Sequence, residues 1–120
     1  MAQASSEPTS RQRLGSLGEA RAARWYRNRG YRILARNWRC REGELDVVAV
    51  RGPTVVFCEV KTRSSDAFGS AVEAVTRSKQ ARVRRAAKQW LATTKRQPLR
   101  VRFDVAAIDA DRITVVRGAF

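Results

Sequence analysis

Apolar and polar residues follow one another in blocks whose spacing changes from helical to extended and back. A helix is expected from Ser16 to Arg29, with Gly30 as the residue that ends it. Three strand-like runs, rich in aromatic and β-branched residues and separated by turn residues, are expected at 31–39, 44–51 and 54–61. Because the runs are close together in the chain, the pattern favours a meander of hairpins.

A second helical pattern follows a loop expected at 64–69, and the helix is expected from 71 to 93. Its apolar side chains fall at i, i+3, i+4, i+7 and i+8, at Val83, Ala86, Ala87, Trp90 and Leu91. After Pro98 the chain returns to strands, expected at 99–108 and 112–116. The order αβββαββ predicts an α/β fold in which helices flank a central mixed β-sheet.

The chain has 120 residues, enough for one hydrophobic core. Residues 1–13 are expected to form a disordered polar and basic tail, and 14–120 a single domain. The first ten residues contain no apolar run typical of a signal peptide, and no stretch is apolar enough to span a membrane. Two cysteines are too few for a disulfide framework, so a cytoplasmic location is expected.

The charge of the chain is strongly unbalanced, with 25 Lys and Arg against 11 Asp and Glu and a net charge of +14. Such a basic domain favours a polyanionic partner, with nucleic acid ahead of an anionic membrane surface. There is no histidine, which excludes Ser-His-Asp and Cys-His catalysis and histidine zinc sites. Carboxylates, lysine, tyrosine or cysteine must therefore carry any acid–base or metal chemistry.

Two acids and a lysine are expected to converge on neighbouring strands. Glu59 and Lys61 lie two apart on one strand and therefore on one face. Asp46 and Glu59 are almost symmetric about the turn at Gly52-Pro53, so hairpin pairing brings them together. Two carboxylates are typical Mg²⁺ ligands, and a nearby lysine can contact a phosphate. An ordinary cross-strand salt bridge remains an equal alternative.

Two further charged residues share faces with apolar side chains. Glu19 lies on the face of the first helix that carries Ala22 and Tyr26, where a buried charge needs a partner or a metal. A favourable interaction with the helix dipole would also explain it. Lys79 lies beside the apolar stripe of the second helix, where it can face a site or extend its ammonium group to water.

The segment from 77 to 102 is basic and contains no acid. Its ten cations are at positions 77, 79, 82, 84, 85, 88, 95, 96, 100 and 102. Solvated faces usually mix both signs of charge, whereas a face of one sign suits phosphate binding that weakens with salt.

Several collinear segments together resemble the YraN-type family of small bacterial proteins. They are Leu17-Gly18-Glu19-Ala20, Gly30-Tyr31-Arg32-Ile33-Leu34, Asn37, Gly43-Glu44-Leu45-Asp46, Phe57-Cys58-Glu59-Val60-Lys61-Thr62-Arg63 and Lys79. That family is similar to Holliday-junction resolvases and to the PD-(D/E)XK superfamily. The resemblance implies a restriction-endonuclease-like core.

The resemblance also implies roles for individual residues. Asp46, Glu59 and the backbone carbonyl of Val60 would hold Mg²⁺ or Mn²⁺, Lys61 would be the catalytic lysine, and Glu19 the first-helix glutamate. Leu45 replaces the proline of the nominal motif. The residues expected to contact nucleic acid are Arg63, Lys79, Arg82, Arg85 and Lys88.

Two functions follow from these expectations. The first is a metal-dependent endonuclease-like protein that hydrolyses phosphodiester bonds in DNA, with branched or structured DNA as one substrate class. The second is a non-catalytic nucleic-acid-binding module that retains the nuclease fold. DNA is favoured over RNA, no membrane partner is expected, and a homodimer is left open.

Overall fold

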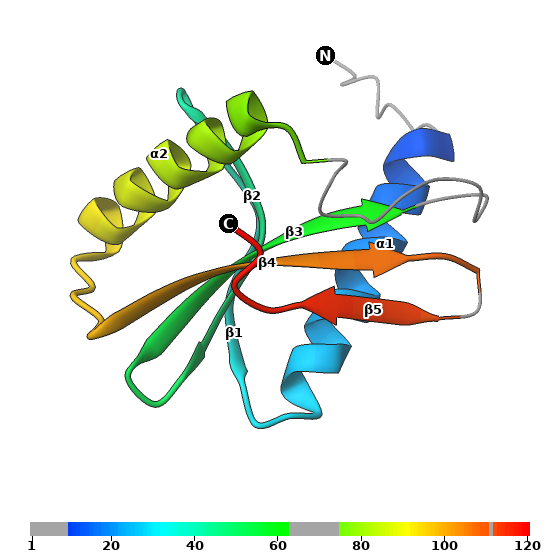
Figure 1. The fold of residues 1–120 in the computed structure, drawn as a ribbon, viewed down its shortest axis with the longest axis horizontal. Coiled ribbons are helices and arrows are strands. Elements are labelled where there is room, and N and C mark those ends of the chain that lie inside the picture. Colours follow the sequence, from blue (N-terminus) through cyan, green and yellow to red (C-terminus); the bar gives the residue numbers. More distant parts are fainter. Residues whose placement is uncertain (1–9, 63–74, 111) are drawn as a thin grey trace, which may run out of the picture.

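The computed structural model describes residues 10–62, 75–110 and 112–120. Its elements are α1 (Ser10–Arg27), β1 (Arg32–Cys40), β2 (Gly43–Arg51), β3 (Thr54–Thr62), α2 (Arg77–Thr94), β4 (Arg100–Ile108) and β5 (Ile113–Val116). The predicted α/β class and the order αβββαββ are confirmed (Figure 1). Neither described helix is long and apolar enough to cross a membrane.

The five strands form one mixed sheet in the order β1-β2-β3-β4-β5. Strands β1, β2 and β3 are the predicted antiparallel meander. Strand β4 pairs with β3 in parallel, from Thr54↔Arg100 to Thr62↔Ile108, and β5 pairs with β4 antiparallel. A parallel pair needs a long crossover connection, and α2 lies in the segment that supplies it.

The two helices cover opposite faces of the sheet, and the alternation of β3 side chains shows how. Val56 and Cys58 pack in a core cluster with Tyr26 of α1, whereas Phe57 packs in a second cluster with Trp90 of α2. In Figure 1, β3, β4 and β5 pass in front of α1. Any residue of β3 with the parity of Phe57, including Glu59, therefore faces the α2 side.

Both helices differ in extent from the sequence prediction. Helix α1 begins at Ser10 and so includes residues 10–13, which were expected in the tail. Helix α2 begins at Arg77, because Thr76 has extended backbone angles and its side chain accepts a hydrogen bond from the Lys79 N–H at 3.1 Å. The apolar run before Thr76 obscured this cap in the sequence. The loop expected at 64–69 lies outside the described residues.

Strands β2 and β3 are paired over only part of their length. Their ladder stops at Val47↔Cys58, while β1 and β2 remain paired as far as Cys40↔Gly43. The hairpin tip reaches α2: a Cβ on Gly43 would lie 3.5 Å from the carbonyl oxygen of Arg82. We call the point where β2 leaves β3, marked by Asp46, Glu59 and Val60, the strand fork.

Candidate active site at the strand fork

The Asp46 carboxylate replaces backbone pairing at the strand fork. Its Oδ2 atom accepts a hydrogen bond of 2.8 Å from the backbone N–H of Val60. That N–H points toward β2 but lies beyond the last ladder pair, so without Asp46 it would lack a partner from β2. The carbonyl of Val60 points to the same side of its strand as the N–H. The fork therefore presents the Asp46 carboxylate and the Val60 carbonyl together.

Glu59 is the most deeply buried acid on the α2 side of the sheet, with 3% exposure. The Lys79 Nζ atom lies 3.5 Å from Oε2 of Glu59, and 31% of the lysine side chain is exposed. This ion-pair contact is not a hydrogen bond, and Oε2 has no hydrogen-bond partner among the described residues. Burying a charge without full hydrogen bonding is unfavourable, so this oxygen is suited to a ligand.

The two fork acids influence each other. Burial is the main cause that raises the pKa of Asp46, and the adjacent Glu59 carboxyl raises it further by hydrogen bonding and by charge repulsion. The Val60 N–H acts in the opposite direction because it stabilises the carboxylate. A cation bound beside Asp46 would offset these effects, because it stabilises the carboxylate form.

The residues at the fork fit a divalent metal ion such as Mg²⁺ or Mn²⁺. Mg²⁺ commonly uses one or two carboxylates together with water and substrate phosphates. Asp46 and Glu59 supply two carboxylates, and the free Oε2 atom of Glu59 is a hard oxygen ligand. Among the described residues no group of three or more His, Cys, Asp or Glu side chains could hold a metal. The fit therefore rests on the two acids and the Val60 carbonyl.

Glu19 approaches the acid pair from α1, on the opposite face of the sheet. It is half-buried, and burial is the main cause that raises its pKa. The charges of Glu44 and Glu59 act in the same direction, whereas Arg36 and Arg39 oppose them. Glu19 also contributes to the raised pKa of Asp46. It lies within electrostatic range of the fork without joining Asp46 and Glu59 in one ligand cluster.

The close packing of Gly18 on β3 holds Glu19 near the fork. A Cβ at Gly18 would lie 2.5 Å from Thr62 Oγ1 and 3.3 Å from Val60 Cγ1. Gly15 lies on the same helix, and a Cβ there would meet nothing within 4 Å.

We expect Gly18→Ala to destabilise the protein by about 1–3 kcal/mol because the added methyl group overpacks this contact. Gly15→Ala is the matched control and should stabilise α1 by about 0.5–1 kcal/mol through helix propensity. Chemical denaturation measures both values, and Thr62→Ala should restore part of the loss in Gly18→Ala. Equal effects at the two glycines would contradict this packing argument.

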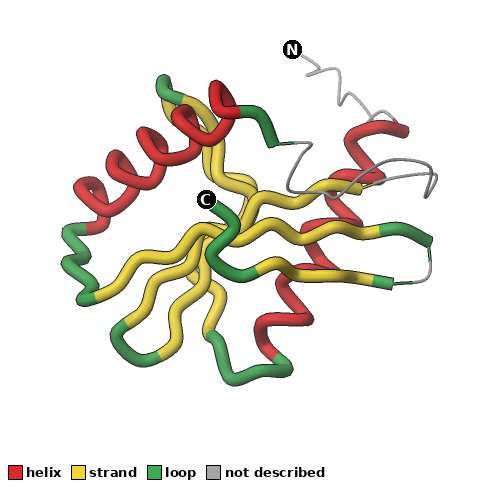
Figure 2. Tube along the Cα trace, viewed as in Figure 1, coloured by secondary structure: helices red, strands yellow, loops and turns green. Residues whose placement is uncertain are grey.

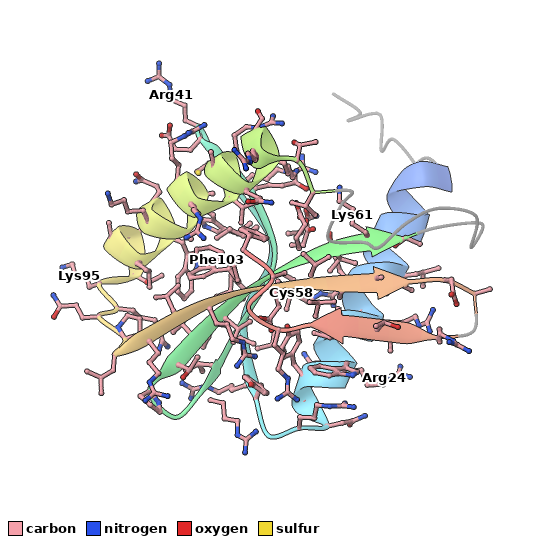
Figure 3. All side chains as sticks on the ribbon, in the orientation of Figure 1. Arg24, Arg41, Cys58, Lys61, Lys95 and Phe103 are labelled. Carbon is pink, nitrogen blue, oxygen red and sulfur yellow. The ribbon has the colours of Figure 1, made fainter. Side chains whose placement is uncertain are left out.

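Lys61 lies on the same face of β3 as Glu59 and does not form a cross-strand salt bridge with Glu59 or Asp46. It is half-buried near the C-terminal end of β3 (Figure 3), with the parity of Glu59. Among the described residues it forms no ion pair, whereas Lys79 is the lysine that contacts Glu59. Lys61 is therefore not engaged by Asp46 or Glu59. Arg63 lies outside the described residues.

The cations predicted to bind nucleic acid do not share one side of α2. Arg82 lies on the flank that meets the β1–β2 hairpin at Gly43. Lys88 is on the flank nearer β4, and the exposed Arg85 lies between the two flanks. Arg84, one of the ten cations of the 77–102 segment, packs its guanidinium 4.6 Å from the ring centre of Phe103.

The third buried acid, Asp104, belongs to a structural network and not to the fork. It is fully buried on β4 and accepts hydrogen bonds from Tyr26 Oη, from Arg102 Nε and Nη2 and from the Gly118 N–H. Every one of these donors comes from the protein itself. Asp104 therefore contrasts with Glu59, which keeps an oxygen without a hydrogen bond.

Comparison with known proteins places the chain in a family. The sequence model of the uncharacterised protein family UPF0102 matches residues 18–108. The UPF0102 protein of Parafrankia sp. (strain EAN1pec) is 53% identical over 114 residues, covering 91% of this chain and 97% of its own. The UPF0102 protein of Moorella thermoacetica is 45% identical, covering 92% and 97%. The resemblance to the YraN-type family is thus confirmed, and the chain belongs to the uncharacterised protein family UPF0102.

Proposed function

We propose that this protein is a metal-dependent nuclease that hydrolyses phosphodiester bonds in DNA, including branched or otherwise structured DNA. One observation carries the proposal: Glu59 is 3% exposed, keeps an oxygen without a hydrogen-bond partner among the described residues, and adjoins Asp46 at the strand fork. A buried, incompletely bonded acid pair destabilises the fold, and such a cost is typical of a functional site. The excess of 25 basic over 11 acidic residues supports a polyanionic substrate.

The residues of the chain divide the chemistry among them. Asp46, Glu59 and the Val60 carbonyl would hold Mg²⁺ or Mn²⁺. When bound, such an ion polarises a phosphoryl oxygen and stabilises the charge that develops in phosphodiester hydrolysis. Lys61, which forms no ion pair among the described residues, donates to a phosphate oxygen and positions the attacking water. Lys79 neutralises Glu59 from α2.

The test is a panel of branched, linear duplex and single-stranded DNAs, incubated with Mg²⁺ or Mn²⁺ at two salt concentrations. We expect cleavage that needs the metal and that Asp46→Ala and Lys61→Ala both abolish. A folded-state check by circular dichroism accompanies each variant. Cleavage that persists unchanged in both variants would remove the fork as its source.

The second candidate is a nucleic-acid-binding module without efficient catalysis. It is favoured by the ion pair between Lys79 and Glu59 and by the absence of a three-residue metal cluster among the described residues. Under this hypothesis binding weakens with salt, and Asp46→Ala binds DNA normally or more tightly because a negative charge is gone. No binding at low salt would contradict both functions.

A further inference from the structure

A groove lies between α2 and the N-terminal half of β4, away from the strand fork. Its volume is about 310 Å³. Leu91, Val101 and Phe103 line the groove together with the cations Arg84, Arg85 and Lys88. Phe103 is 9% exposed and its ring stacks on both Phe57 and Phe120, so Leu91 and Val101 form the accessible apolar floor. Phe103 is seen between α2 and the sheet in Figure 3. We call this feature the α2–β4 groove.

The groove exists because β5 is short. It pairs with β4 only from Val105 to Ile108, so it leaves the N-terminal half of β4 without a neighbour on that side. The C-terminal segment turns back across the sheet (Figure 2) and donates from the Ala119 N–H to the Phe103 carbonyl at 2.7 Å. It does not reach the start of β4, where Val101 stays 43% exposed.

Positive charge extends from the groove along one flank of α2 toward the N-terminus of the helix. Arg77, Arg84 and Lys88 occupy positions i, i+7 and i+11 of α2 and so share one flank of the helix. At 1.5 Å per residue this flank is about 16 Å long. Lys79, which contacts Glu59, lies on a different face of the helix, about 200° around the axis from Arg77. The segment from 77 to 102 contains no acid, so the flank attracts a negatively charged chain.

We propose that the α2–β4 groove binds one unpaired nucleotide of the DNA strand, with its base on the apolar floor and its phosphates on Arg85 and Lys88. A basic groove that follows the phosphate backbone is typical of single-strand binding sites, and the apolar floor gives an unpaired base a surface on which to pack. Bases of an intact duplex are stacked inside the helix and cannot reach the floor. The inferred substrate thus contains a single-stranded segment, and its cleavage rests on the function proposed above.

The test measures binding in EDTA, so that no cleavage is needed. Fluorescence anisotropy compares a labelled single-stranded oligonucleotide with the same sequence as a blunt duplex. Val101→Glu should weaken single-strand binding about tenfold, because it adds an acid to the floor. Val116→Glu is the matched control, since Val116 is a strand valine with 37% exposure, and its effect should stay below about twofold. If Val101→Glu fails to fold, Lys88→Glu replaces it as the test variant and Arg41→Glu as its control, since both positions are exposed.

The base contact is tested separately from the charge. An oligonucleotide with abasic sites should bind more weakly than its parent to the unmodified protein but equally to Val101→Glu. Equal binding of the abasic and parent strands to the unmodified protein would overturn the inference, as would full displacement by polyglutamate at matched charge. Loss of binding in Val101→Glu without any metal-dependent cleavage would keep the groove and reject the nuclease. Metal-dependent cleavage together with unaltered binding in Val101→Glu would reject the groove and keep the nuclease.

Discussion

Glu59→Gln is expected to raise the stability of the metal-free protein while it removes metal-dependent cleavage. Glutamine has nearly the same shape as glutamate and no charge, so it ends the repulsion with Asp46 and the desolvation of a buried carboxylate. The lost attraction is small, because the Lys79 contact is 3.5 Å long and 31% of that side chain is exposed. The expected gain is about 1–3 kcal/mol in the free energy of unfolding at pH 7.

Thermal unfolding in EDTA measures this gain, which corresponds to a rise of about 4–12 °C in the melting temperature. Adding Mg²⁺ or Mn²⁺ should stabilise the unmodified protein and leave Glu59→Gln unchanged. Cleavage should fall by at least about 100-fold, since a metal ion supplies several kcal/mol of transition-state stabilisation.

Glu44→Gln is the matched control for this substitution. Glu44 is paired with Arg39 at 3.2 Å, and the two side chains are 37% and 70% exposed. The same loss of charge there should change stability by less than about 0.5 kcal/mol. If Glu59→Gln is less stable than the unmodified protein, the buried carboxylate is held by structural interactions and the argument for a ligand at the fork fails.

Asp104→Ala is expected to destabilise the protein by about 3–5 kcal/mol. The substitution leaves Tyr26, which is fully buried, without the acceptor it reaches at 2.6 Å, and it removes both hydrogen bonds of Arg102 to the carboxylate. Burial raises the pKa of Tyr26, so its hydroxyl stays protonated and must remain a donor. This cost is a large share of the roughly 5–15 kcal/mol that stabilises a typical domain.

Chemical denaturation of Asp104→Ala and Tyr26→Phe separates the network into parts. Tyr26→Phe removes one donor to a charged acceptor and should cost about 1.5–3 kcal/mol. Asp104→Ala must cost more, because it also removes the acceptor of Arg102 Nε and of the Gly118 N–H, although Arg102 keeps its hydrogen bond to Tyr31. A smaller loss for Asp104→Ala than for Tyr26→Phe would contradict the network.

Glu59 and Asp104 show how far the sequence predicts the site. The proximity of Asp46 to Glu59 was predictable from their symmetry about the Gly52-Pro53 turn, although the observed ladder stops one position short of them, at Val47↔Cys58. Nothing in the sequence distinguished Asp104, an acid in an apolar strand, from a functional residue. Only its four donors, which include Tyr26 from α1, identify it as structural.

The partner of Glu59 shows a second limit of prediction. Spacing along β3 places Lys61 on the same face as Glu59, and that parity is a property of any strand. The ion pair is nevertheless made by Lys79, from a helix that begins beyond the end of the strand. Which cation reaches an acid depends on how α2 packs over the sheet, and local spacing contains no information on that packing.

The sequence by itself determined the order of the elements, the basic character and the shared face of β3 on which Glu59 and Lys61 lie. These features depend on local periodicity and composition. The tertiary structure alone decided that β2 pairs with β3 only from Val47 onward, that the Asp46 carboxylate accepts the hydrogen bond of the Val60 N–H, and that Gly18 sets α1 against β3. Each of these joins residues far apart in the chain, and close packing between whole elements, not the pattern within one element, fixes such contacts.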